Sequence, residues 1–175
     1  MNRAVAAAVA PSPVPLADPV RIRPAAATDA GALYRLITDN IETGHLLPRP
    51  LSEVKSHAPR FLVAAGPAGV VGCAELTPLS PRLCEVRSLV VAAGSRGQGV
   101  GTRLLQAVIG QAGARRVPRV CAFAHDPRPF IRLGFSIVPH PWLPDKIAAD
   151  CVRCPWFRRC AQYAVILDLD PAGAA

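Results

Sequence analysis

A glycine-rich turn between an apolar strand and an apolar helix is the feature that most constrains the fold of this chain. Leu89-Val90-Val91 ends a strand-like stretch, apolar side chains recur at helical spacing after Thr102, and Arg96-Gly97-Gln98-Gly99-Val100-Gly101 lies between them. A helix N-terminus presents backbone N–H groups without intrahelical partners and the positive end of the helix dipole. Glycines allow a ligand to approach that backbone closely. The sequence therefore predicts a turn that binds phosphate through the main chain.

Two familiar phosphate-binding motifs do not match this turn. A Walker loop ends in Gly-Lys-Ser/Thr, whereas Gly101-Thr102-Arg103 contains no lysine. A dinucleotide fingerprint has the order G-x-G-x-x-G near the first strand and an acidic residue about 20 positions later. Here the order is G-x-G-x-G, and no acidic residue lies between Glu85 and Asp126. A plain surface loop is the structural alternative at this stage.

Apolar runs and their spacing predict short strands with helices between them. Helices are expected after Thr28, which is a better N-cap than Asp29, after Ser52, over residues 100–113, and around Phe130. This order indicates one mixed α/β domain with a central sheet. The strands are expected at residues 20–23, 61–65, 70–76, 84–91, 117–124, 135–138 and 163–169.

Length and composition favour a single domain. Residues 1–19 are rich in alanine and proline and are expected to form a disordered leader, followed by a domain over 20–170 and a tail over 171–175. The sequence has no apolar run of about 18 residues, so no membrane span is expected. The net charge of +8 comes from scattered arginines, which favours small anions over a nucleic-acid partner. We expect a cytoplasmic protein, and the sequence leaves a homodimer open.

The six cysteines fall into two groups. Cys73, Cys84 and Cys121 lie in apolar stretches, where a reduced thiol behaves as a small hydrophobic group. The other three, at positions 151, 154 and 160, form a cluster near the C-terminus. Three thiols are one fewer than a structural zinc site usually has, and a disulfide is disfavoured in the cytoplasm. Packing and local thiol chemistry are therefore expected here, and no metal.

Two motifs resemble those of the GNAT N-acetyltransferases. The hexapeptide from Arg96 to Gly101 matches their Q/R-x-x-G-x-G/A signature, and residues 130–135 (FIRLGF) resemble their late helix motif. The resemblance covers about residues 20–169 and implies a mostly antiparallel sheet, splayed at the cofactor strand and flanked by helices. It also implies acetyl-CoA as the acetyl donor. The cofactor-binding residues that it implies are Leu89, Val90, Val91, Arg96, Gly97, Gln98, Gly99, Val100, Gly101, Thr102 and Phe130.

A narrower resemblance concerns the acceptor. Residues 45–49 (HLLPR), 142–147 (WLPDKI) and 150–160 resemble the acetyltransferase domain of N-acetylglutamate synthases. This resemblance implies a small-molecule amine as partner, with L-glutamate leading, and a role in arginine biosynthesis. It implies that Arg49 holds a substrate carboxylate, which suits a guanidinium fork. Arg87 could join Arg49 or instead neutralise Glu85. Another amine acceptor and a non-catalytic domain that senses acetyl-CoA are the alternatives.

Acetylation of an amine requires loss of a proton, and free amines titrate near pH 8–10. Glu85 is similar in position to the general-base glutamate of several GNAT members, and pairing with a neighbouring arginine for structure is the alternative. Strand alternation predicts that Glu85, Arg87, Leu89 and Val91 share one face. Where many GNAT enzymes have a tyrosine that protonates the leaving thiolate, this chain has Phe130. His125 or solvent is then expected to supply that proton.

Overall fold

The computed structural model describes residues 20–44, 46–67 and 69–169. The predicted leader, 1–19, and the predicted tail, 171–175, lie outside the described residues. Within the described part, all seven predicted strands and the four predicted helices are present, and two further short α-helices, Ile41–Gly44 and Pro144–Ala149, were not predicted.

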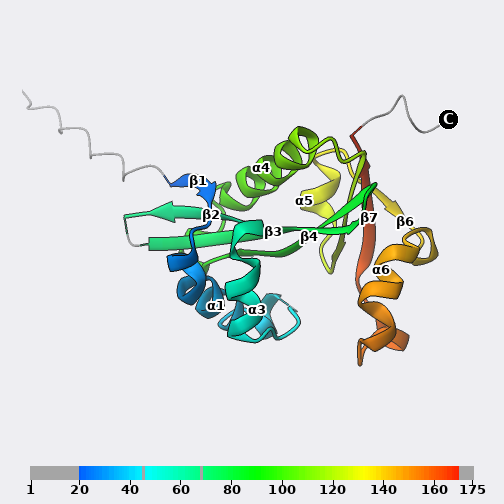
Figure 1. Ribbon diagram of the computed structural model, residues 1–175, viewed down its shortest axis with the longest axis horizontal. Coiled ribbons are helices and arrows are strands. Elements are labelled where there is room, and N and C mark those ends of the chain that lie inside the picture. Colours follow the sequence, from blue (N-terminus) through cyan, green and yellow to red (C-terminus); the bar gives the residue numbers. More distant parts are fainter. Residues whose placement is uncertain (1–19, 45, 68, 170–175) are drawn as a thin grey trace, which may run out of the picture.

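One open sheet of seven strands forms the centre of the molecule, in the order β1-β2-β3-β4-β5-β7-β6 (Figure 1). Every neighbouring pair is antiparallel except β4 and β5, which run parallel. The predicted mixed α/β class with a mostly antiparallel sheet is confirmed. The strands are β1 (Arg21–Pro24), β2 (Phe61–Gly66), β3 (Gly69–Ser80), β4 (Leu83–Val91), β5 (Arg119–Ala124), β6 (Ser136–Val138) and β7 (Tyr163–Asp168).

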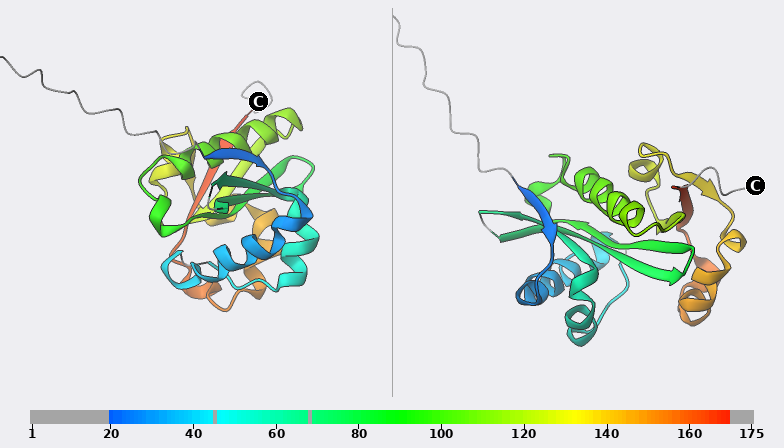
Figure 2. Two further views of the ribbon diagram at one scale, coloured as in Figure 1. Left: turned by 90° about the vertical axis from the view of Figure 1, so that its left-hand side faces the viewer. Right: turned by 45° about the horizontal axis from the view of Figure 1, so that its top comes forward.

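Helices cover both faces of the sheet (Figure 2). Helix α4 lies on one face, and α1 and α3 lie on the other. The α-helices are α1 (Ala30–Thr38), α2 (Ile41–Gly44), α3 (Leu51–His57), α4 (Val100–Ala114), α5 (Arg128–Ile131) and α6 (Pro144–Ala149). Short 3-10 helices are η1 (Ala27–Asp29), η2 (Ala58–Arg60), η3 (Ala93–Ser95), η4 (His140–Trp142), η5 (Cys151–Arg153) and η6 (Phe157–Arg159).

The two helical layers each bury an apolar stripe. Leu104, Leu105 and Val108 of α4 are fully buried against the sheet. On the opposite face, Leu33 and Ile37 of α1 pack with residues of β2 and β3. Complete burial of one such side chain contributes about 1.5–3 kcal/mol, so these stripes fix the positions of both helices on the sheet.

The expected helix caps are wrong. Thr28 lies inside η1, and α1 begins after Asp29. The Asp29 carboxylate instead accepts the Ala26 N–H at 2.7 Å and pairs with Arg23 at 2.6 Å. Helix α3 begins after Pro50 without a side-chain cap, so Ser52 lies within its first turn. The Ser52 cap is not used because Pro50, whose φ is fixed, already precedes the first residue of α3.

The sheet opens between β4 and β5. These strands pair only over Leu83–Glu85 and Arg119–Cys121, although both continue beyond that point. Strand β5 remains paired with β7 along its whole length. The predicted splay at the cofactor strand is therefore confirmed, and it begins at Glu85.

Candidate active site

The separation of β4 from β5 opens a cavity of about 550 Å³. One wall is β4 from Glu85 to Leu89, and the opposite wall is the segment from Phe123 to Phe130. The rest of the lining comes from the loop Leu46 to Arg49 and from Glu53, Lys146, Asp150 and Gln162. Polar groups from distant parts of the chain therefore meet at the point where the sheet splits.

A β-bulge in β4 changes which side chains share a face. Cys73 is opposite Val90 and Glu75 is opposite Arg87, so β4 contains one residue more than β3 over this interval. Ser88 adopts a φ of 48° within it. An extra residue reverses the alternation beyond it.

Leu89 and Val91 consequently pack toward α4, whereas Glu85 and Arg87 lie on the opposite face of β4, nearest α6. Val90 packs with the α1 side. The expectation that Glu85, Arg87, Leu89 and Val91 share one face is wrong beyond the bulge. Nothing in simple alternation reveals an inserted residue.

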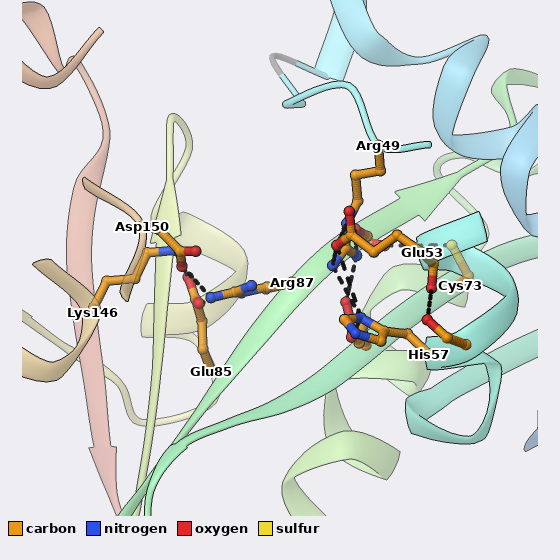
Figure 3. Close-up of polar contacts among 11 residues, drawn as sticks. Arg49, Glu53, His57, Cys73, Glu85, Arg87, Lys146 and Asp150 are labelled. Carbon is orange, nitrogen blue, oxygen red and sulfur yellow. Dashed lines mark hydrogen bonds and ion pairs between the residues drawn. The ribbon is translucent and has the colours of Figure 1, made fainter. Parts of the chain in front are cut away.

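Glu85 is 2% exposed and lies between two cations. Its Oε2 accepts a hydrogen bond from Arg87 Nε at 2.5 Å, and its Oε1 is 2.7 Å from Lys146 Nζ. Asp150 accepts from both Arg87 and Lys146, the latter at 2.9 Å. Figure 3 shows these four side chains as one network that links β4 to the end of α6. The pairing of Glu85 with a neighbouring arginine, foreseen as the structural alternative, is present, and it does not remove Glu85 from the cavity lining.

The network shifts the pKa values of its two most exposed members. Burial disfavours the charge of Arg87, yet the charge and hydrogen bond of Glu85 and the charge of Asp150 raise the pKa of Arg87 overall. Burial likewise acts to raise the pKa of Asp150, but the hydrogen bond and charge of Lys146 and the charge of Arg87 lower it overall. Both groups are thus held in their charged forms at neutral pH.

Arg49 belongs to a second network on the same face of the sheet (Figure 3). Its Nη1 donates to Glu75 Oε2 at 2.5 Å and to Ser88 Oγ at 3.2 Å, and its Nη2 is 2.7 Å from Glu53 Oε1. Glu75 is fully buried, and its second oxygen lies 3.1 Å from His57 Nδ1. Arg49 is therefore held from α3, β3 and the bulge at once, and its side chain is only 10% exposed. Arg49 is thus a largely buried ion-pair residue and not an exposed arginine at a helix start.

The glycine-rich turn lies at the far end of β4 and leads directly into α4. Gly97 and Gly99 have φ values of 75° and 76°, and a Cβ at either position would meet nothing within 4 Å. Gly99 is the N-cap of α4 and supplies no side-chain cap. The first backbone N–H groups of this 15-residue helix therefore have no side-chain cap. These features fit an anionic group such as a diphosphate.

Side chains of the turn hold its shape. Arg96 Nε donates to Val91 O at 3.0 Å, and its Nη2 donates to Asn40 Oδ1 at 2.6 Å. Gln98 Nε2 donates to Gly94 O at 3.1 Å. Arg96 thus ties the turn to the end of α1, because Asn40 is buried and also donates to Leu36 O.

The other predicted cofactor residues divide between the cavity and the helix. Leu89 and Phe130 line the cavity, and Phe130 makes an edge-on contact with Phe135 at 5.4 Å between ring centroids. Val100 is buried beneath the turn, whereas Gly101 and Thr102 occupy the first turn of α4 at the surface. His125, the candidate proton donor, also lines the cavity.

The family model described as Acetyltransferase (GNAT) family matches residues 31–135. That span contains β2 to β5, the turn and α4, whereas Lys146 and Asp150 of the cavity lie beyond it. The chain belongs to the GNAT acetyltransferase family. It is accordingly an N-acetyltransferase that uses acetyl-CoA.

Three GNAT relatives extend this assignment. An uncharacterized N-acetyltransferase, CT2212, from Chlorobaculum tepidum is 28% identical over 89% of this chain and 100% of its own length. An amino-acid acetyltransferase from Shewanella oneidensis is 31% identical over 72% of this chain but only 29% of its own length. The N-acetylglutamate synthase of Neisseria gonorrhoeae, solved with coenzyme A and N-acetyl-glutamate, is 25% identical with a TM-score of 0.76, over 86% of this chain and 35% of that one.

Sequence reasoning did not assign roles to Glu75, Lys146, Asp150 and His57 in this GNAT site. Glu75 looks like an ordinary polar position within an apolar strand, and only its pairing with Arg49 reveals a function for it. A short helix at Lys146 could have been predicted, because Pro144 and Asp145 are typical of a helix start. The contacts of Lys146 with Glu85 and of Asp150 with Arg87 each span about sixty residues and have no local signature.

Within the described residues, no group of three or more His, Cys, Asp and Glu side chains is arranged to hold a metal ion. No helix in the described ranges is long and apolar enough to cross a membrane. All six cysteines are free thiols.

Proposed function

We propose that this enzyme transfers the acetyl group of acetyl-CoA to the α-amino group of a small acidic amino acid, with L-glutamate as the leading acceptor. The observation that supports this best is the set of three cations, Arg49, Arg87 and Lys146, in the cavity that also contains Glu85. Cationic side chains at the acceptor end suit a substrate with carboxylates. The relatives that act on amino acids point to the same class.

Each of these cations already has carboxylate partners, and those partners differ in exposure. Glu75 and Glu85 are buried, whereas the side chains of Glu53 and Asp150 are 36% and 34% exposed. The two exposed carboxylates are the ones that can move away at small cost. We infer that they stand where acceptor carboxylates bind, Glu53 at Arg49 and Asp150 at Arg87 and Lys146.

Glu85 is proposed to accept the proton of the acceptor ammonium, directly or through a water molecule. Its ion pairs leave lone pairs on both oxygens, since a carboxylate has about four acceptor sites. Arg87 and Lys146 would then act as positioning residues that fix the carboxylate at the opening of the sheet. Such a base typically contributes about 10²–10⁴ in rate.

The turn and the splayed strand are proposed to hold the cofactor, which supplies an activated acetyl thioester when bound. The residues around Gly97, Gly99 and Gly101 would contact its diphosphate, and those around Leu89 to Val91 would contact its arm through the backbone. Phe130 would pack against the thioester end of the cavity. Proton return to the thiolate is assigned to His125 or solvent.

The direct test measures thiol release from acetyl-CoA with a panel of acceptors: glutamate, aspartate, glutamine, leucine, lysine and a peptide N-terminus. The kcat/KM for glutamate should exceed that for glutamine and leucine by at least tenfold. Of these three acceptors, only glutamate has two carboxylates, one for the position of Glu53 and one for that of Asp150. Preference for an uncharged or cationic acceptor would refute the acidic-substrate proposal and leave the family assignment intact.

A matched pair of variants tests the displacement of Asp150. Asp150→Asn removes the internal competitor from Arg87 and Lys146 and is expected to lower the KM for glutamate severalfold. Asp145→Asn, in the first turn of α6 and outside the cavity lining, should leave this KM unchanged. A higher KM for Asp150→Asn would mean that Asp150 binds the acceptor amine instead.

A further inference from the structure

The cysteine cluster that follows α6 lines a second, smaller hollow beside the acceptor cavity. This hollow has a volume of about 60 Å³, and the side chains of Cys151, Cys154 and Cys160 all contribute to its wall. It shares five residues with the acceptor cavity, among them Lys146 and Asp150. The three thiols are partly exposed. They therefore lie together, in reach of small reagents, next to the residues that hold Glu85.

The remaining thiols of the protein are in a different environment. Cys73, Cys84 and Cys121 are at most 3% exposed. Burial, with the charge of Glu75 adding to it, raises the pKa of Cys73 to about 12. Burial also raises the pKa of Cys84 and of Cys121, and it raises the pKa of Cys151 as well. Exposure therefore separates the two groups of thiols: because small disulfides and oxidants do not reach Cys73, Cys84 and Cys121 at their buried positions, these three are expected to be inert.

Local backbone geometry brings Cys151 and Cys154 into disulfide range. The Cys154 N–H donates to Cys151 O at 3.0 Å, which closes the single turn η5. The Cα atoms at the ends of such a turn lie within about 7 Å of each other, and disulfides join Cα atoms about 4.4–6.8 Å apart. No large backbone movement is then required to connect the two sulfurs.

This pair is directly attached to the acceptor site through the chain. Asp150 immediately precedes Cys151, and its carboxylate accepts hydrogen bonds from Arg87 and Lys146. If Asp150 must leave these cations for an acceptor carboxylate to bind, the segment after it must be free to move. A covalent bridge across η5 restrains that segment.

We propose that Cys151, Cys154 and Cys160 form an oxidisable thiol site, in which reaction with a small disulfide closes a Cys151–Cys154 bridge and weakens acceptor binding. One protein thiolate attacks the disulfide and releases one small thiol; the second protein thiolate then attacks the mixed disulfide and releases the other. The protein loses two electrons and two thiol protons, and the small disulfide is reduced to two thiols. The effect on the acceptor rests on the proposed function, whereas the bridge does not.

The test incubates the full chain with oxidised glutathione and counts thiols under denaturing conditions before and after. The expected result is a fall from six free thiols to four, with the bridge mapped to Cys151 and Cys154 by mass spectrometry and reversed by dithiothreitol. The oxidised enzyme should show a KM for glutamate at least threefold higher and a KM for acetyl-CoA within twofold of the reduced enzyme. C151S and C154S should abolish the response, and C160S should retain it.

Each of the other possible outcomes refutes one part of this proposal. Six thiols after oxidation, or a bridge to Cys160, would refute the assigned pair. A bridge without a change in acceptor KM would refute the coupling to Asp150. Zinc could instead be found bound to the purified protein and protect the three thiols from oxidation until a chelator removes it. That result would refute the oxidisable site in favour of a metal site. If no acceptor is acetylated, the proposed function is refuted. The thiol count and the mapped bridge then still show whether Cys151 and Cys154 form the proposed disulfide.

Discussion

Replacing Gly99 by alanine tests two properties of the turn: its left-handed backbone conformation and the open space beside it, where we propose that the diphosphate binds. Gly99 has a φ of 76°, and its added Cβ would meet no atom within 4 Å. The cost in the free protein is therefore backbone strain without a steric clash, about 1–2 kcal/mol for a left-handed L-residue. In a domain of this size that lowers the unfolding temperature by a few degrees.

The effect on the cofactor should be larger than the effect on stability alone suggests. The new methyl group occupies the open space beside Gly99, at the helix start where we propose that the diphosphate binds. Loss of one hydrogen bond to a charged phosphate removes about 1.5–3 kcal/mol. Because 1.4 kcal/mol corresponds to a factor of ten, the Kd for coenzyme A should rise roughly 10- to 100-fold, measured by isothermal titration calorimetry.

Two glycines of the same chain provide controls. Gly69 in the β2–β3 turn has a φ of 104° and similarly open surroundings, so Gly69→Ala should lose comparable stability without losing affinity for coenzyme A. Gly94 has open surroundings and no positive φ, so Gly94→Ala should change neither quantity. Wild-type affinity in Gly99→Ala, with stability reduced as in Gly69→Ala, would refute the assignment of this turn to the diphosphate.

Three further changes test the two ends of the site. Glu85→Gln should lower kcat at least 100-fold with little change in the KM for acetyl-CoA; a loss below tenfold would leave Glu85 a purely structural partner of Arg87. Asn40→Ala removes one of the two acceptors of the Arg96 guanidinium and leaves only Val91 O; it should weaken coenzyme A binding about tenfold, whereas unchanged affinity would show that the turn needs no tether to α1. The native pKa of Asp150 is lowered, so its ion pairs stabilise the fold above its unfolded-state pKa near 3.9 and are lost as pH falls through the native value. Denaturant unfolding of Asp150→Asn should accordingly show a deficit at pH 7 that shrinks below about pH 4, and a deficit constant with pH would contradict this linkage.

Local sequence was sufficient for the cofactor side of the site. The strand end at Leu89-Val90-Val91, the glycines and the apolar stripe of α4 are contiguous, so the turn and the 15-residue helix follow from short-range rules. The mixed α/β class followed for the same reason, because the order of strand and helix signals along the chain leaves few arrangements. Even here the caps at Thr28 and Ser52 failed, since neighbouring backbone groups and Pro50 had already satisfied those helix starts.

The acceptor side depended on tertiary structure. The bulge at Ser88 reverses the strand phase and separates Leu89 from Arg87, and one inserted residue has no compositional signature. Glu85 and Arg49 could be named as candidates from the sequence, but their partners Lys146 and Glu75 come from other elements of the fold.

The sequence by itself determined the glycine-rich turn at the start of α4 and the order of most strands and helices, because both follow from interactions between residues close together along the chain. The tertiary structure alone decided which charges face one another at the split of the sheet. Their energies depend on distance and burial between segments about 26 to 63 residues apart, and no local pattern specifies either quantity.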